Sequence, residues 1–134
     1  MIVKKVTPLL AGLIFLFGVY IVLHGHLTPG GGFQGGSVIA SGVMLLFLAY
    51  RRFHVSHKVL STLESLAGIT FAAIGLLGLI YAKSFLANSV LPLGQWNKLL
   101  SAGVIPLIYI AVGFKVGAEL SGLIADMIST TKED

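Results

Sequence analysis

Apolar residues in this chain gather into four long runs, and short polar or glycine-rich segments separate one run from the next. An α-helix needs about 20 apolar residues to cross the roughly 30 Å hydrocarbon core of a bilayer. The pattern therefore predicts an all-α integral membrane protein with four transmembrane helices, over about residues 8–23, 35–50, 59–81 and 99–128. No internal repeat or linker divides them, so residues 1–134 are expected to form a single four-helix domain.

Prolines mark two places where the expected helices begin or change direction. Thr7 followed by Pro8 is the arrangement of an N-cap residue with proline at the first helical position. Pro106 falls seven residues into the fourth predicted helix, where its missing N–H is expected to kink or restart the helix. The second helix is short for a bilayer, so part of the glycine-rich segment before it is expected to dip below the membrane surface.

Composition supports the membrane interpretation. Hydrophobic residues make up 56% of the chain and charged residues 10%, with a mean hydropathy of +0.97, whereas an ordinary soluble domain has about 25% charged residues. The net charge of +4 is spread over loop positions without a basic stripe, so no nucleic-acid partner is expected. The chain has no cysteine, which excludes thiolate metal sites, iron–sulfur ligation and disulfides.

Positively charged residues are divided unequally between the two sides of the predicted bundle. One side has only Lys83 and Lys98. The side that holds both termini and the loop after the second helix carries Lys4, Lys5, Arg51, Arg52, Lys58 and Lys132. Because cytoplasmic loops carry the excess of lysine and arginine, both termini are expected in the cytoplasm and the glycine-rich segment on the outer side of the cell membrane.

A glycine-rich segment joins the first two predicted helices and contains six of the chain's 17 glycines. Its most distinctive residues are His24, His26, Thr28, Pro29, Gly30, Gly31, Gly32, Phe33, Gly35 and Gly36. Three glycines after a proline predict a tight, irregular turn whose peptide groups lack helical partners. Such a turn is tolerated at membrane depth only where protein or water surrounds it, so we expect it to be buried. A phosphate cradle is disfavoured, because no strand precedes the glycines and no Lys-Ser/Thr pair follows them.

The run His24-Gly-His-Leu-Thr-Pro-Gly-Gly-Gly-Phe-Gln-Gly-Gly36, followed by an apolar helix, closely resembles the signature of the MnhB-type subunits of Mrp multisubunit sodium/proton antiporters. The four-helix length fits the same family, so the resemblance covers nearly the whole chain. It implies a small subunit of a cation-translocating complex, without redox or cofactor chemistry of its own. The last helix, with Pro106, Lys115 and Glu119, looks more like the Mrp-like modules of archaeal membrane-bound hydrogenase and sulfur reductase complexes.

Ionisable residues inside the predicted transmembrane helices are the main candidates for chemistry. Steps of four and seven place Lys115, Glu119 and Asp126 on one face of the last helix. Counted from Leu99 at ~1.5 Å per residue, Lys115 lies about 24 Å and Glu119 about 30 Å into the helix. Glu64, about one turn inside the cytoplasmic end of the third helix, is expected to join the same cluster. We expect an ion or proton pathway here, because charges at membrane depth are costly and mark functional sites.

A structural interpretation of this face stays open, in which Lys115 snorkels to the interface or simply pairs with Glu119 one turn away. The order of lysine before glutamate is the less favourable one for helix stabilisation, which favours a functional role. Gly113, Gly117 and Ser121 lie roughly 160° round the helix from Lys115 and form a face suited to close helix packing. With one polar face and one small-residue face, this helix is expected to be enclosed by other helices.

Two histidine pairs give a weaker signal. His24 and His26 fall on the opposite membrane side from His54 and His57, and each pair alone offers fewer ligands than the three or four of a zinc site. No metal site is therefore expected. His24 and His26 are expected to hydrogen-bond free backbone groups of the glycine-rich segment, with proton relay as the alternative.

Together with the resemblance, these residues predict a small non-catalytic membrane subunit of an Mrp-type antiporter module that contributes to Na⁺/H⁺ translocation. Its expected partners are other membrane subunits, the lipid bilayer, and Na⁺ or H⁺ as the transported ion. Such a module can belong to a membrane-bound hydrogenase-type respiratory complex. The alternative is a purely structural subunit that holds larger antiporter-like subunits in place. A stand-alone membrane enzyme is disfavoured, since the sequence has no nucleophile–base or metal constellation.

Overall fold

The computed structural model describes residues 2–50, 55–88, 91, 94 and 102–131 of the 134-residue chain. Within them lie four helices: α1 (Ile2–Leu23), α2 (Gly32–Ala49), α3 (His57–Ala82) and α4 (Ile105–Thr130). Each of the four is long and apolar enough to cross a membrane. The predicted all-α fold with four transmembrane helices is therefore confirmed, and the chain is a multi-pass membrane protein.

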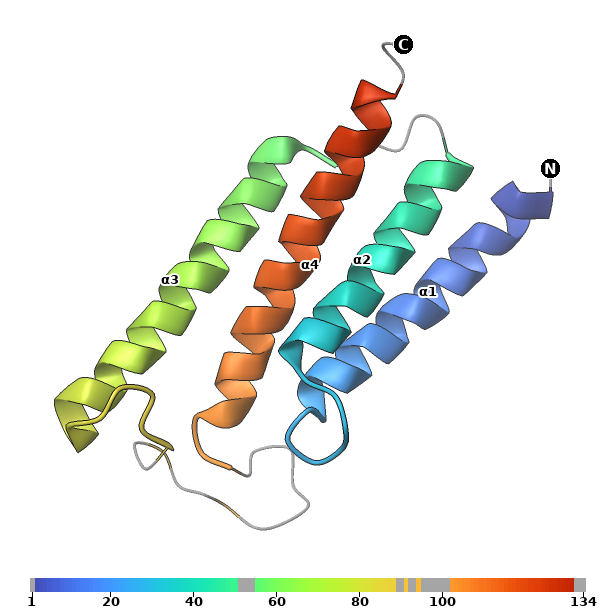
Figure 1. Cartoon of the computed structure of the whole chain (residues 1–134). Helices are drawn as coiled ribbons and strands as arrows, with labels where there is room; N and C mark the ends of the chain where they lie inside the picture. The colour runs from blue at the N-terminus through green and yellow to red at the C-terminus, as the bar shows by residue number, and fades with distance from the viewer. Residues whose placement is uncertain (1, 51–54, 89–90, 92–93, 95–101, 132–134) are drawn as a thin grey trace.

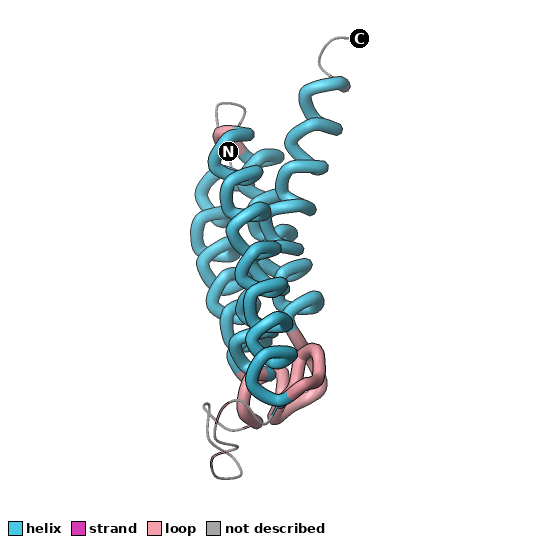
Figure 2. Tube along the Cα trace, turned by 90° about the vertical axis from the view of Figure 1, so that its left-hand side faces the viewer, coloured by secondary structure: helices cyan, strands magenta, loops and turns pink. Residues whose placement is uncertain are grey.

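The four helices stand side by side in a row, in the order α3, α4, α2, α1 (Figure 1). After a quarter turn they largely superimpose, so the row is a layer (Figure 2). α2 packs against both α1 and α4, while α4 is the main helix neighbour of α3. Chain direction alternates from α1 to α2 and from α3 to α4, whereas the central helices α2 and α4 run parallel (Figure 1). The last helix of the chain therefore lies between two other helices of the same chain.

The first helix starts earlier than the sequence pattern predicted. α1 begins at Ile2, so Pro8 lies inside the helix and the predicted N-cap at Thr7 is wrong. Pro8 has no N–H to donate to the carbonyl of Lys4, four residues earlier, and that oxygen is left for another donor. The hydroxyl of Tyr50, at the end of α2, donates to it at 2.7 Å. A hydrogen bond from the neighbouring helix thus allows α1 to continue through the proline.

The fourth helix starts later than predicted. Residues 102–104 form a turn whose first two positions have left-handed φ values of 71° and 66°, and α4 begins at Ile105 with Pro106 in its first turn. The side-chain oxygen of Asn88 accepts the N–H of the residue before the helix at 2.9 Å. The helix predicted over 102–104 is therefore wrong, and residues 99–101 lie outside the described part of the chain. Of the two outcomes expected at Pro106, a kink or a start, the structure shows the start.

The two middle helices agree with the predicted ranges to within three residues. α3 begins two residues before the predicted range and ends one residue after it. α2 begins at Gly32 instead of residue 35, so the last glycines of the glycine-rich segment belong to a helix. At about 1.5 Å per residue its 18 residues span roughly 27 Å, close to the thickness of the hydrocarbon core.

Replacing Tyr50 with phenylalanine should destabilise the bundle, because the Lys4 carbonyl then loses the hydroxyl that donates to it. We expect the free energy of unfolding to fall by about 0.5–1.5 kcal/mol, measured by denaturation of the purified protein in detergent. In a Pro8→Ala background the helix regains its own donor for Lys4, so the same Tyr50→Phe change should cost clearly less. An equal loss in both backgrounds would contradict the role assigned to Pro8.

Candidate functional site

The glycine-rich segment reverses the chain between α1 and α2 over residues 24–31. Its first part is a turn in which the His24 carbonyl accepts the backbone N–H groups three and four residues later. Its second part has φ values of 157° at Gly30 and 153° at Gly31, which residues with a side chain rarely adopt. The chain can therefore enter α2 at Gly32 only because glycines occupy the two preceding positions.

Glycines form the contact between α2 and α4. A Cβ on Gly32 would lie 2.5 Å from the Tyr109 carbonyl oxygen, and one on Gly36 would lie 2.7 Å from the Gly113 carbonyl oxygen. Gly113 and Gly117 have the same four-residue spacing as Gly32 and Gly36, so two GxxxG motifs meet in parallel. Backbones that approach this closely gain dispersion contacts, which drive helix association in lipid.

The other side of α2 packs equally closely on α1. A Cβ on Gly18 would lie 3.1 Å from the Gly35 carbonyl oxygen, and one on Gly35 would lie 2.9 Å from the Gly18 carbonyl oxygen. In the turn, a Cβ on Gly25 would lie 2.7 Å from the Cα of Gly31, so the segment folds tightly on itself. On α4, Ser121 is 2% exposed and continues the stripe of small buried residues.

The histidines of the turn differ in their surroundings. The ring of His24 stacks on Tyr20 with centroids 4.3 Å apart, and its Nδ1 lies 3.3 Å from the Tyr20 carbonyl oxygen. His24 therefore contacts the last turn of α1, whereas the sequence predicts a bond to the glycine backbone. His26 is half-buried, and the exposed residues of this segment include Thr28, Pro29 and Phe33.

Three charged side chains meet between α3 and α4. The ammonium nitrogen of Lys115 lies 3.3 Å from a Glu64 carboxylate oxygen and 3.9 Å from a Glu119 carboxylate oxygen. Their side chains are 39–50% exposed within this chain. Since two carboxylates approach one ammonium, the cluster has an excess of negative charge when all three groups are ionised. We call Lys115, Glu64 and Glu119 the charged cluster.

The depth of the charged cluster differs from the depth estimated from the sequence. That estimate counted from Leu99, but α4 begins at Ile105, so Lys115 is about 15 Å and Glu119 about 21 Å from the helix start. The full helix of 26 residues is about 39 Å long. The two residues therefore flank the middle of α4, and Glu64 lies two turns inside α3.

A cleft of about 160 Å³ opens between α3 and α4 beside the charged cluster. Its walls are His57, Leu60, Ser61, Glu64, Ala118, Glu119, Gly122, Leu123 and Asp126. Five of these nine residues are polar or ionisable, although both helices are apolar enough to span a membrane. The cleft therefore brings five polar or ionisable side chains together along two helices of membrane-spanning length.

Asp126 faces His57 and not Lys115. The His57 Nε2 atom lies 3.8 Å from Asp126 Oδ2, and both residues line the cleft. Sequence reasoning treated His57 only as a possible metal ligand and missed both it and Ser61 as members of the polar wall. The spacing of these residues could have revealed them. His57, Ser61 and Glu64 follow one another at steps of four and three residues, which places them on one face of α3. Among the described residues, no group of three or more His, Asp and Glu side chains is placed to hold a metal ion.

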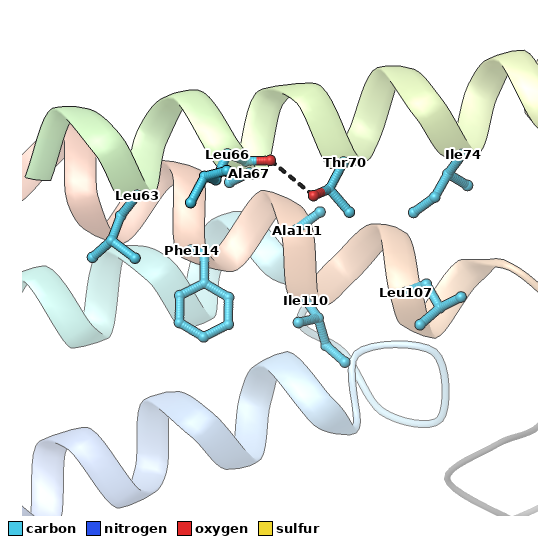
Figure 3. Close-up of a pocket in the computed structure, with 9 residues that line it drawn as sticks. All are labelled: Leu63, Leu66, Ala67, Thr70, Ile74, Leu107, Ile110, Ala111 and Phe114. Atoms are coloured by element: carbon cyan, nitrogen blue, oxygen red, sulfur yellow. Dashed lines mark hydrogen bonds between the residues drawn. The ribbon is translucent and has the colours of Figure 1, made fainter. Parts of the chain in front are cut away.

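The other side of the α3–α4 pair carries an apolar groove of about 450 Å³ (Figure 3). Its one hydroxyl, on Thr70, donates to the Leu66 carbonyl at 2.8 Å and is thus satisfied within its own helix. Each helix has a groove residue directly before a residue of the charged cluster. Leu63 precedes Glu64 on α3, and Phe114 precedes Lys115 on α4. One position is a rotation of about 100°, so the pair has an apolar side and a polar side.

Four membrane-length helices, backbone contacts through glycine and a charged cluster within the span define a small multi-pass membrane protein with an intramembrane polar site. The family described as "Domain related to MnhB subunit of Na+/H+ antiporter" matches residues 2–122. The chain belongs to this family, and the resemblance stated from the glycine-rich segment is confirmed.

Two known proteins are similar to this chain in sequence. The chain is 35% identical over 130 residues to an uncharacterised protein of Methanocaldococcus jannaschii, a match that covers 90% of this chain and 49% of that protein. It is 38% identical over 82 residues to the B subunit of the Na⁺/H⁺ antiporter of Bacillus subtilis, or 61% of this chain and 52% of the relative. The chain spans about half the length of these two relatives.

A solved structure shows the same fold. It is a chain of the membrane-bound sulfane sulfur reductase, an archaeal respiratory membrane complex, and it is 38% identical with a TM-score of 0.84. The match covers 95% of this chain and 57% of that chain.

Replacing Gly36 with valine should separate α2 from α4, because a Cβ there would meet the Gly113 carbonyl oxygen. We expect a loss of about 1–3 kcal/mol in stability, the usual cost of overpacking, with a lower yield of assembled complex. Gly12→Val and Gly68→Val are matched controls, since nothing lies within 4 Å of a Cβ at either position. If Gly36→Val is as stable as the controls, the backbone contact between α2 and α4 is not essential.

Proposed function

We propose that this chain is a small membrane subunit of an Mrp-type antiporter module and contributes to the movement of Na⁺ or H⁺ through it. The observation that carries the proposal is the contact of Lys115 with Glu64 and Glu119 within the membrane-spanning part of α3 and α4. Family membership supports the transport module. The likeness to a chain of the sulfane sulfur reductase supports a place in a respiratory membrane complex, and we extend the proposal to hydrogenase-type complexes as hosts.

The number of carboxylates favours transport over a purely structural role. A charge in the middle of a bilayer costs about 2.5–3.5 kcal/mol on insertion scales, and one opposite charge is enough to offset Lys115. The structure brings two carboxylates to it. One carboxylate is enough for a structural ion pair, whereas a second gives the charged cluster a group that can take up and release a cation or a proton.

Other subunits are the expected partners in this proposal. The side chains of the charged cluster are 39–50% exposed in the isolated chain, and at this depth they require protein or water around them. We propose that neighbouring membrane subunits cover the polar side of the α3–α4 pair and that lipid borders other faces of the bundle. We assign no catalytic role to this chain and attribute any redox step to other subunits.

The proposed orientation places both termini in the cytoplasm, following the bias of lysine and arginine. The polar cleft then opens toward the cytoplasmic ends of α3 and α4. The turn between α1 and α2, at the end of the bundle opposite the chain termini (Figure 1), lies on the outer side.

Single cysteines test this orientation, because the natural chain has none. Thr131 and Ser84 are both exposed and lie at opposite ends of the bundle. We expect Thr131→Cys to resist impermeant thiol reagents in intact cells and Ser84→Cys to react with them. The reverse labelling would show that the termini are outside.

The charged cluster is tested by removing all three charges together, in Glu64→Gln/Lys115→Met/Glu119→Gln. Single changes are poor tests, since one charge left without its partner in a buried pair costs about 3–5 kcal/mol and threatens assembly. The triple variant leaves none of the three charges, so we expect the complex to assemble. Sodium-driven proton movement in inverted vesicles should fall to the background of vesicles without the complex.

Lys5→Met is the matched control for this experiment, because it removes a lysine charge at the exposed end of α1. It should leave transport at the wild-type rate. If the assembled triple variant also transports at that rate, the charged cluster is structural and the proposed function of this site is wrong.

A further inference from the structure

His57 and Asp126 lie at the end of the cleft nearest the helix termini, and the charged cluster lies at its other end. Their side chains come from opposite walls, with His57 Nε2 3.8 Å from Asp126 Oδ2. The side chains are 75% and 62% exposed, so both are open to water. An imidazole beside a carboxylate is a group that can exchange protons with the solvent.

The charged cluster is equally far from this pair along both walls. His57 precedes Glu64 by seven residues, and Asp126 follows Glu119 by seven. Seven residues are two helical turns, or about 10.5 Å. This distance is too long for a direct hydrogen bond, and Ser61 lies between the two ends on α3.

Small residues keep the space between the two ends open. Ala118 and Gly122 line the cleft on α4, and a Cβ on Gly122 would meet its nearest atom, on the side chain of Leu60, at 4.0 Å. The cleft of about 160 Å³ is several times the roughly 30 Å³ that one water molecule occupies in the liquid. Roughly three hydrogen-bonded waters, about 2.8 Å apart, bridge such a gap. The cleft therefore has room for such a chain of water, with five polar or ionisable side chains along it.

The groups in the cleft suit a proton better than a sodium ion. A bound Na⁺ needs several oxygen ligands, but Lys115 already places an ammonium group beside both carboxylates of the charged cluster. Proton transfer needs groups that accept and donate in turn, and imidazole, carboxylate, hydroxyl and water all do so. Among the residues that the structure describes, the titratable groups that line the cleft with His57 are Asp126, Glu119 and Glu64.

We propose that His57, which lies beside Asp126, takes protons from the aqueous side and delivers them through the cleft to Glu64 and Glu119. The imidazole binds a proton at one ring nitrogen and releases a proton to water beside Ser61, and successive transfers end on a carboxylate oxygen. Each transfer breaks one bond to hydrogen and forms another, so atoms and charge balance. Lys115 offsets the charge of whichever carboxylate remains ionised. This inference rests on the proposed transport function and names H⁺ as the ion that uses this cleft.

Blocking the cleft tests the pathway. In Gly122→Leu the new side chain projects into the cleft, where the nearest atom to a Cβ lies 4.0 Å away on Leu60, so the complex should assemble while the water chain is interrupted. We expect sodium-driven proton movement in inverted vesicles to fall about tenfold or more, the scale of losing a positioned proton carrier. Gly12→Leu on α1, where nothing lies within 4 Å of a Cβ, should leave the rate within about twofold.

Removing the imidazole tests the residue itself. His57→Asn keeps a polar side chain at an exposed position, so it remains informative even if the leucine variant fails to assemble. Imidazole accepts and donates protons in turn and an amide does not, so the transport rate should depend less strongly on pH in His57→Asn than in the wild type. A merely structural side chain would not produce this change in the pH profile.

The outcomes separate this proposal from the function of the charged cluster. Slow transport in Gly122→Leu together with a flattened pH profile in His57→Asn supports the pathway. If both variants transport like the wild type while the triple variant Glu64→Gln/Lys115→Met/Glu119→Gln is inactive, protons enter elsewhere and only the pathway is overturned. A slow Gly122→Leu with an unchanged His57→Asn profile overturns the role of His57. If the triple variant is also active, both proposals fail.

Discussion

The parallel contact between α2 and α4 constrains the rest of the bundle. Lipid tails are as apolar as leucine, so helices in a bilayer associate largely through dispersion, which grows as their backbones approach. Glycines at the closest points of this contact allow that approach. The same contact fixes the rotation of α4, since Lys115 lies two residues from both Gly113 and Gly117 and is thus directed away from α2. The packing face and the charged face of α4 are therefore set by one arrangement.

Local sequence patterns predicted the number of helices and most of their ranges. The predicted starts of α1 and α4 were wrong because each depends on a contact with a residue far away in the sequence. Four apolar runs are a property of contiguous sequence, so the number of helices and the ranges of α2 and α3 were within reach. The path of α1 through Pro8 depends on a hydroxyl 46 residues away, at Tyr50. The start of α4 depends on a left-handed turn that the side chain of Asn88, 16 residues away, supports. Neither partner can be identified from local sequence.

The candidate site also has features that local sequence predicts and others that depend on how the helices pack. Lys115 and Glu119 form a pair that the four-residue spacing of a helix already indicates, and the glycine-rich motif is contiguous and so identifies the family. Glu64 was placed near them by depth alone, and its contact with Lys115 follows from the register of α3 on α4. His57 escaped notice because it was weighed as a metal ligand, while its neighbour in space, Asp126, lies at the far end of the chain.

The helices differ in how many neighbouring helices they contact, and this difference affects the contact between α3 and α4 at the charged cluster. α2 is held on both sides by glycine contacts with α1 and α4, whereas α3 has α4 as its main helix neighbour. The contact of α3 with α4 includes the ion pair of Lys115 with Glu64, so a titratable group helps to hold the less supported helix. Protonating Glu64 would remove the charge that attracts Lys115 and weaken that contact. In the proposed function, the arrival of a proton and the packing of α3 are therefore energetically linked through the same pair of side chains.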